Sequence, residues 1–430
     1  MIIQPRVLKG FRDFLPEGEI ARKSLLEKIE SSFRSYGFVP IDTPALEYAD
    51  ILLGKGGGET EKQIYRFLDN GGRDVAMRFD LTVPFAGFLA EHRESLVFPF
   101  KRYHIAKVWR GENTQRGRYR EFTQCDFDTI GSDTPDCDFE ILHVMRNTLL
   151  SVSGGDVKIH INHRGVFNRF LLKLGLLDKS VEILRTVDKL SKIGKDAAIA
   201  LLSEFLTISQ SEEILDFIGV SGSFEEILKS MEDVTGKCPE LERLLLIRQS
   251  MLDSGIQDCF ILDPSITRGL DYYTGVVFES FLADLPAIGS ICSGGRYDNL
   301  VGLYSKEPLA GVGASIGIDR LIAGLQALGR LKEVKSYAAA AIARVEGISA
   351  GVLQALGEKL REKGIPCEVF LNEEKPGRQF QAAEKKGLKW LIIPDAEKPL
   401  ENALTLRDLS KRENREGLTM EELIGIINGS

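Results

Sequence analysis

The sequence has few of the residues that cross-link a protein or bind a metal. Its 430 residues include six cysteines, five histidines and two tryptophans. No two cysteines form a C-x-x-C pair and no histidine cluster accompanies them, so neither a zinc site nor a disulfide framework is expected. Scattered cysteines of this kind are typical of proteins in a reducing cytosol.

Long apolar stretches are also missing. No segment approaches the ~18 uninterrupted apolar residues of a membrane helix. The first residues, 1–6, have neither the apolar core of a signal peptide nor the Arg- and Ser-rich pattern of a transit peptide. The sequence therefore predicts a cytoplasmic protein with no membrane partner.

Positive charge is not in excess. The chain has 55 Lys and Arg against 63 Asp and Glu, a net charge of -8. This balance argues against a protein that coats nucleic acid indiscriminately, although a local basic face can still contact RNA. Two common nucleotide-binding signatures are absent as well: no Walker A sequence occurs, and the glycines of 311–320 do not match G-x-G-x-x-G.

What is present is ordinary globular material. Hydrophobic residues make up 43% and charged residues 27% of the chain, and the length predicts two or three domains. A helix is expected over about 20–36, because Leu25, Ile29 and Phe33 recur four apart and Gly37 suits a C-cap.

Later segments differ in character. Residues 97–109 and 118–130 are rich in aromatic and β-branched residues and predict a long antiparallel hairpin. Leu-rich helical patterns fill about 165–252, as a helical insertion would. Beyond a boundary near 331–336, strands and helices alternate, which predicts a small α/β domain. Its expected strands are 338–345, 367–371, 390–394 and 403–406, and its first expected helix is 351–363.

The second strand of the hairpin carries unusual polar residues. Gln124, Asp126 and Asp128 alternate along it, so their side chains should share one face. Carboxylates on a strand otherwise rich in Phe and Cys require cationic partners or ligands. Arginines beside them suit phosphate oxygens, because the guanidinium fork binds them bidentately. We expect such arginines in the preceding turn: Arg116, Arg118 and Arg120.

Three further segments combine Arg, Tyr, Asp and Gly: 267–275, 294–298 and 311–320. Taken singly, each has a simpler interpretation as strand packing, a turn or a close helix–sheet contact. His104, on an apolar strand, is expected to be a core histidine rather than a catalytic base. The five histidines show no metal-ligand spacing.

Taken together and in order, these segments resemble the histidyl-tRNA synthetase family from end to end. Lys9–Asp13 matches the family's opening, 37–47 matches class II motif 1, Arg110 with 118–122 matches motif 2, and 317–320 matches motif 3. Residues 268–273 and 294–298 match its two histidine-specific motifs, which are far more specific. The resemblance implies an α+β fold with a class II antiparallel sheet flanked by helices. It implies a catalytic domain over 1–330 with a helical insertion at about 166–253, and an α/β anticodon-binding domain over 336–430.

The resemblance also implies roles for individual residues. The proposed catalytic arginines are Arg110 and Arg268, placed on the α-phosphate and the substrate carboxylate. The histidine-binding residues it implies are Asp80, Leu81, Thr82, Arg110, Gln124, Asp128, Arg268, Tyr272 and Tyr273. The ATP-binding residues are Arg110, Arg118, Arg268 and Arg320. Gln115 and Arg116 are candidates for the tRNA acceptor stem, and Arg378 and Gln379 for the anticodon.

The implied reaction is ligation of L-histidine to tRNA(His) through a histidyl-adenylate. ATP is a substrate together with Mg²⁺, and no tightly bound, protein-ligated metal is expected. The family resemblance also implies a homodimer. Two alternatives remain open: a synthetase-like regulatory subunit of ATP phosphoribosyltransferase, which resembles the catalytic core, and a non-catalytic RNA-binding module.

Overall fold

The computed structural model of the protein describes residues 2–53, 59–187, 189–266, 273–299, 302, 304, 309–397 and 403–429. The chain divides into two units. The larger contains Met1–Arg12 and Leu25–Leu331, and the smaller contains Asp13–Ser24 and Lys332–Ser430. Among the described residues, no helix is both long and apolar enough to span a membrane.

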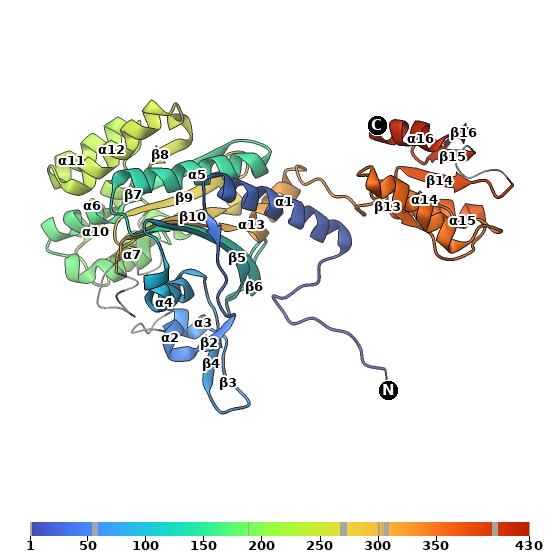
Figure 1. Ribbon diagram of the computed structural model, residues 1–430. Coiled ribbons are helices and arrows are strands. Elements are labelled where there is room, and N and C mark those ends of the chain that lie inside the picture. Colours follow the sequence, from blue (N-terminus) through green and yellow to red (C-terminus); the bar gives the residue numbers. More distant parts are fainter. Residues whose placement is uncertain are drawn as a thin grey trace. The chain divides into compact units, whose positions relative to one another are not determined.

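The larger unit is built on an eight-stranded sheet with the order β1-β5-β6-β11-β10-β9-β7-β8 (Figure 1). The strands are β1 (Val39–Pro40), β5 (Phe100–Trp109), β6 (Glu121–Ile130), β7 (Val157–His163), β8 (Phe260–Leu262), β9 (Val276–Leu282), β10 (Cys292–Tyr297) and β11 (Gly311–Gly317). From β5 to β7 every neighbouring pair is antiparallel, as predicted. The edge strands β1 and β8 instead pair in parallel, each reached by a long crossover connection.

Helices α1 (Pro16–Ser35), α5 (Pro135–Ser153) and α13 (Ile318–Ala327) contribute to the apolar core against the sheet. The predicted stripe of α1 is confirmed, since Ile29 and Phe33 are fully buried and Leu25 nearly so. Helix α5 has a well-defined start and end: the Thr134 side chain accepts a hydrogen bond from the Cys137 backbone N–H, and Gly154 ends the helix with φ +62°.

Between β7 and β8 the chain forms a helical layer, seen in green and yellow in Figure 1. Its helices are α6 (Arg164–Lys173), α7 (Ser180–Val187), α8 (Leu190–Ile193), α9 (Lys195–Leu202), α10 (Ile208–Ile218), α11 (Phe224–Thr235) and α12 (Pro239–Asp253). Capping boxes at Thr207 and Ser223 start α10 and α11. Helix α12 packs on α5 and joins this layer to the sheet.

A small substructure follows β1. It contains the three-stranded sheet β2-β4-β3 and the short helices α2 and α3. Their bounds are β2 (Leu46–Tyr48), α2 (Ala49–Leu53), α3 (Glu59–Gln63), β3 (Arg66–Leu68) and β4 (Asp74–Met77). Helix α4 (Thr82–His92) comes next, and its Phe85, Ala86 and Leu89 pack with Ile130 and Tyr297. The start of α4 is thereby tied to the sheet.

The smaller unit has a five-stranded sheet in the order β13-β12-β14-β15-β16. Its elements are β12 (Ala340–Ile342), α14 (Ala350–Glu362), β13 (Cys367–Val369), α15 (Pro376–Lys385), β14 (Trp390–Pro394), β15 (Leu404–Asp408), β16 (Glu413–Leu418) and α16 (Met420–Asn428). Apolar side chains of α14 and α16 cover one face of the sheet, and those of α15 cover the other. Strand β16 was not predicted, because five of its six side chains are exposed and its sequence has no alternating apolar pattern.

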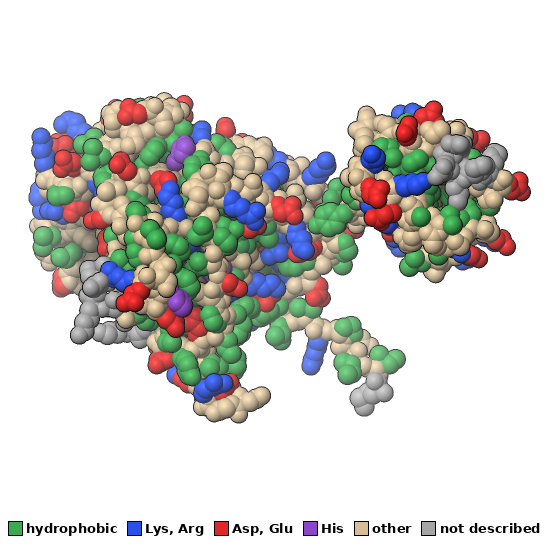
Figure 2. Space-filling model, viewed as in Figure 1, with side chains coloured by type: hydrophobic (Ala, Val, Ile, Leu, Met, Phe, Trp, Pro, Cys, Tyr) green, Lys and Arg blue, Asp and Glu red, His purple; other side chains and the backbone are tan. Residues whose placement is uncertain are grey.

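Charged side chains are distributed over the surface. Lys and Arg side chains lie among Asp and Glu side chains over the face in view (Figure 2). This mixture agrees with the modest net charge and places any specific recognition in local clusters of residues rather than in the overall field.

Candidate active site

The predicted face of β6 is confirmed. The side chains of Gln124, Asp126 and Asp128 are all at least nine-tenths buried. Their cross-strand neighbours on β5 are Ala106, His104 and Arg102. Because directly opposed residues of an antiparallel pair project to the same face, three polar residues of β6 meet two polar residues of β5 here.

Asp128 is held from two sides. Its Oδ2 lies 2.6 Å from Nη2 of Arg102, a residue with no exposed surface. The Tyr297 hydroxyl donates a hydrogen bond of 2.5 Å to its Oδ1. A carboxylate has about four lone-pair sites, so two remain for a ligand. Burial raises the pKa of Asp128, while the charge of Arg102 and the hydrogen bond from Tyr297 lower it.

The cationic partner that the acidic strand requires is Arg102, on the neighbouring strand β5. Arg102 was not among the residues predicted from the sequence. Strand register decides this pairing, and register is not visible in a single strand's sequence. Gly313 on β11 makes room for the carboxylate, since a Cβ there would lie 1.9 Å from Asp128 Oδ1.

Gln124 presents an acceptor without a partner. Its Nε2 donates to the Ser315 hydroxyl at 2.7 Å. Its Oε1 is buried and has no hydrogen-bond partner among the residues that the structure describes. A buried acceptor of this kind is costly unless a ligand or water satisfies it, so Gln124 is well suited to bind an N–H donor.

Asp126 lies between these residues on the same face. Burial raises its pKa to about 7, an effect that Arg102 opposes and Asp128 reinforces. Across from it, His104 is buried, and its Nε2 lies 2.9 Å from Asp42 Oδ1. Burial and the charges of Arg102 and Arg78 lower the pKa of His104 to about 4, so it is neutral at physiological pH and fits the predicted core role.

The titration of Asp126 should make the free energy of unfolding depend on pH. Its folded-state pKa lies above the ordinary value, so the stability contributed by the protonated carboxyl is present at low pH and lost as pH rises towards 7. Replacing it by Asn removes this loss. We therefore expect the free energy of unfolding of Asp126→Asn, taken relative to that of the wild type, to increase by on the order of a few kcal/mol from pH 5 to pH 8.

Urea unfolding of both proteins at the two pH values measures this difference. Asp196→Asn, at an exposed position in α9, is the control and should show no such pH dependence. A constant difference between Asp126→Asn and the wild type at both pH values would show that Asp126 is ionised throughout.

The segment Asp80–Thr82 forms a buried turn at the start of α4. The Asp80 carboxylate accepts a hydrogen bond of 2.9 Å from the Val83 backbone N–H. Leu81 is fully buried, so only its backbone can serve a ligand, and Thr82 is 8% exposed. Burial raises the pKa of Asp80, and the charges of Arg110 and Arg102 lower it. This places Asp80 in the same electrostatic environment as Asp128.

Arg110 lies just beyond the end of β5. Its Nε donates to the Phe79 carbonyl oxygen at 3.1 Å. The guanidinium lies 4.3 Å from the ring centroid of Phe79 and 5.1 Å from that of Phe122. The two rings and the carbonyl fix the direction of this arginine beside Asp80.

The turn between β5 and β6, which carries Arg118, packs against the start of α13, which carries Arg320. Gly117, with φ +71°, packs so closely on α13 that a Cβ there would lie 3.1 Å from Arg320 Cα. Arg118 follows it directly and pairs with Glu112. Arg320 donates to the Ser290 carbonyl oxygen at 2.7 Å. Segments about 200 residues apart in sequence therefore meet through one glycine.

The N-terminal segment reinforces this contact. Arg12 pairs with Asp319, and its guanidinium lies 3.7 Å above the ring centroid of Tyr119. The other oxygen of Asp319 accepts the Thr123 backbone N–H at 3.0 Å. The resemblance matched Lys9–Asp13 without giving it a role, and the structure shows that Arg12 links the hairpin turn to α13.

The remaining predicted residues have different surroundings. The ring of Tyr273 lies against Gly295, where a Cβ would be 2.9 Å from its Cδ1, and it packs in the cluster that contains Tyr297. Arg268 and Tyr272 lie outside the described residues. Gln115 and Arg116 are exposed at the hairpin turn, with backbone hydrogen bonds between Gln115 and Arg118.

The two candidates of the smaller unit also differ. Arg378 is exposed on α15. Gln379 is 5% exposed, and its amide donates to the carbonyl oxygens of Arg344 and Glu374 and accepts from the Arg344 N–H. Its side chain is committed to the fold, which leaves Arg378 as the candidate for a contact with RNA.

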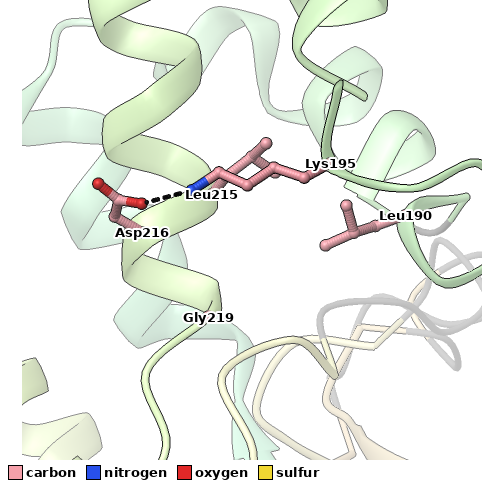
Figure 3. A pocket seen from close by; sticks show the side chains of 5 residues that line it. All are labelled: Leu190, Lys195, Leu215, Asp216 and Gly219. Carbon is pink, nitrogen blue, oxygen red and sulfur yellow. Dashed lines mark hydrogen bonds and ion pairs between the residues drawn. The ribbon is translucent and has the colours of Figure 1, made fainter. Parts of the chain in front are cut away.

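A separate hollow lies in the helical layer (Figure 3). It is lined by Leu190, Lys195, Leu215, Asp216 and Gly219, and its polar feature is the 3.0 Å ion pair between Lys195 and Asp216. None of the predicted site residues lines this hollow.

Comparison with known proteins decides the family. The family model for histidyl-tRNA synthetase matches residues 10–321, and the model for an anticodon-binding domain matches residues 341–429. The chain belongs to the histidyl-tRNA synthetase family. Its class II fold was therefore correctly predicted.

Similar proteins and solved structures support the same family assignment. A histidine–tRNA ligase of Treponema denticola is 50% identical, with 96% of each chain covered. One from Rhodopirellula baltica is 46% identical, again with 96% of each chain covered. The crystal structure of histidyl-tRNA synthetase from Nostoc has a TM-score of 0.88 at 31% identity, with both chains fully covered. A Bacillus halodurans structure described as an ATP phosphoribosyltransferase regulatory subunit/histidyl-tRNA synthetase has a TM-score of 0.75 at 21% identity, covering 91% of this chain and 99% of that one, which shows the shared fold alone.

Proposed function

We propose that this chain is an enzyme that joins L-histidine to tRNA(His) at the expense of ATP, which becomes AMP and diphosphate. The observation that supports this most directly is the acidic cluster of Asp80, Asp126 and Asp128, buried beside Arg102 and Arg110. Burial raises the pKa of all three carboxyls, so a cation bound beside them would favour their ionised forms. An amino acid with an α-ammonium group and an imidazole supplies this positive charge and the ring N–H donors.

In the first step, a carboxylate oxygen of histidine attacks the α-phosphorus of ATP. An O–P bond forms, the bond to the bridging oxygen breaks, and diphosphate leaves. We propose that Asp80, Thr82 and the Leu81 backbone hold the α-amino group. Gln124 and Asp128 bind the ring, which Tyr272 and Tyr273 enclose. An analogue without ring N–H groups would leave these buried groups unpaired, which is a strong basis for discrimination.

The arginines supply positioning and charge rather than covalent chemistry. We propose that Arg110 and Arg268 bind the α-phosphate and the substrate carboxylate, where negative charge develops in the transition state. Arg118 and Arg320 bind the β- and γ-phosphates, a role supported by the close packing of Gly117, the residue before Arg118, on the backbone of Arg320. Mg²⁺ arrives with ATP as part of the substrate and neutralises phosphate oxygens.

In the second step, the histidyl group passes to the 3′-hydroxyl of the terminal adenosine of the tRNA, and AMP leaves. We propose that Gln115 and Arg116 face the acceptor stem and that Arg378 contacts the anticodon region. A catalytic domain over 1–330, with its helical insertion at about 166–253, and an anticodon-binding domain over 336–430 divide these tasks. We further propose that the enzyme is a cytoplasmic homodimer.

The regulatory-subunit alternative makes a different prediction. Such a protein binds ligands without forming an adenylate. We expect purified protein to catalyse histidine-dependent ATP–pyrophosphate exchange and, with tRNA(His), to form histidyl-tRNA. Replacing histidine by another amino acid should reduce exchange to background. Failure to exchange, with histidine binding intact, would favour the regulatory role.

A further inference from the structure

Arg102 is a residue that neither the family resemblance nor the motifs single out. It lies on β5, is fully buried, and forms the ion pair with Asp128. Its charge also lowers the pKa of Asp80 and Asp126, so three buried carboxylates share it. Its guanidinium lies 4.1 Å from the ring centroid of Phe85 on α4. Arg102 therefore contacts Asp128, which is proposed to bind the ring, and its charge reaches Asp80, which is proposed to bind the amino group.

A purely structural role explains this residue poorly. A buried ion pair is weak evidence for stability, because the desolvation of both charges offsets their attraction. Arg102 also keeps Nε and Nη1 buried without a hydrogen-bond partner among the described residues. An arginine retained only to hold the fold would normally have its donors satisfied.

The geometry at Asp128 suggests what the arginine does. Arg102 forms an ion pair with Oδ2 and the Tyr297 hydroxyl donates a hydrogen bond to Oδ1, so each carboxylate oxygen has a polar neighbour that favours one orientation. On β11, Gly313 leaves space for this carboxylate, because a Cβ there would lie 1.9 Å from Asp128 Oδ1. The charge of Arg102 lowers the pKa of Asp128 and so favours the anionic carboxylate, which accepts hydrogen bonds only. A protonated Asp128 would present a donor to the ligand instead.

We propose that Arg102 is a positioning residue for histidine recognition. It keeps Asp128 ionised and oriented, so that this carboxylate accepts a hydrogen bond from the imidazole N–H. The inference rests on the proposed function and adds a residue outside the motifs to it. Arg102 acts through Asp128 and makes no contact with the phosphates of ATP.

The test begins with exchange by the wild-type protein, since its failure would remove the proposed function itself. Arg102→Met keeps the length of the stem and removes the charge. We expect its KM for histidine to rise by about 10- to 100-fold, the range for losing a charged hydrogen bond. The KM for ATP should stay within about twofold. Arg102→Lys, which keeps a positive charge, should recover part of the loss.

A double-mutant cycle separates this role from a structural one. If Arg102 acts through Asp128, Arg102→Met should add little to the KM for histidine once Asp128 is Asn. Independent structural damage would multiply the two effects and raise both KM values, and that result would overturn the proposal. Arg248→Met is the matched control, because it removes a partly buried ion pair with Glu225 in the helical layer. It should leave both KM values unchanged.

The pH profile gives a further readout. The charged or titratable groups around Asp128 are Arg102 on β5, Asp126 on β6, Tyr297 on β10 and Asp80 before α4. The acid limb of kcat/KM for histidine should move to higher pH in Arg102→Met. Free histidine titrates identically in both assays, so it cancels in the comparison. An unmoved acid limb together with a wild-type KM would contradict the inference.

If the Arg102→Met protein does not fold, a second variant still tests the proposal. Tyr297→Phe removes one hydroxyl from the same carboxylate and keeps the ring packed. Its KM for histidine should rise by about 10-fold at an unchanged KM for ATP. Arg102→Lys then replaces Arg102→Met in the cycle with Asp128→Asn. Additive effects in that cycle would overturn the proposal.

Discussion

Replacing Arg268 by alanine should lower histidine-dependent ATP–pyrophosphate exchange by about a thousandfold, the upper range for removing one transition-state donor. The reason is charge. Negative charge develops on the α-phosphate as the bond to diphosphate breaks, and a guanidinium group held there stabilises the transition state more than bound ATP. The effect should therefore appear mainly in kcat, with a smaller change in the KM for ATP.

Arg116→Ala is the control for this experiment. Arg116 is exposed at the hairpin turn and is proposed to face tRNA rather than ATP. Its removal should leave exchange near the wild-type rate. Melting temperature and oligomeric state should match the wild type in both variants. Near-normal exchange by a folded Arg268→Ala protein would refute the role assigned to this arginine.

Ending the chain after Leu331 should separate the two proposed steps. Among the described residues, the side chains that form the main core of the larger unit all lie within 25–331, so the sheet and its helices should keep their packing. We expect exchange within a few-fold of the full-length rate. Charging of tRNA(His) should fall by at least about 100-fold, because each charged contact with RNA contributes about 1.5–3 kcal/mol and several would be lost together.

Two measurements make that result interpretable. Circular dichroism shows whether the shortened chain is folded, which matters because Asp13–Ser24 groups with the smaller unit. Arg378→Ala in the full-length chain removes one proposed RNA contact and should weaken charging without affecting exchange. Equal losses of exchange and charging in a folded, shortened chain would argue against a separate RNA-binding role.

Local patterns were enough to place several elements. The stripe of Leu25, Ile29 and Phe33 predicted α1, although the helix begins at Pro16, earlier than the apolar pattern. The hairpin of β5 and β6 was predicted from its composition and is confirmed. These elements follow from periodicity along the chain, which depends only on neighbouring residues. Strand β16 was not predicted, because it is an exposed edge strand without an alternating apolar pattern.

The residues of the candidate site could be predicted only in part from local patterns. The shared face of Gln124, Asp126 and Asp128 follows from alternation along one strand. The residues that control their chemistry, Arg102 and Tyr297, come from β5 and β10. Tyr297 lies in the segment 294–298 that the family resemblance singled out. Arg102 is one of several basic residues on β5, and nothing marked it until the pairing of the strands was known.

By itself, the sequence determined the family, the class II fold and the strand that carries the acidic side chains, because motifs and alternation are properties of a single stretch of chain. Tertiary structure decided which cation faces which carboxylate. It brought Gly117 against Arg320, buried Gln379 in hydrogen bonds with the backbone, and paired Asp128 with Arg102. Such contacts depend on register and close packing between distant segments, where a shift of one residue would send every side chain to the opposite face.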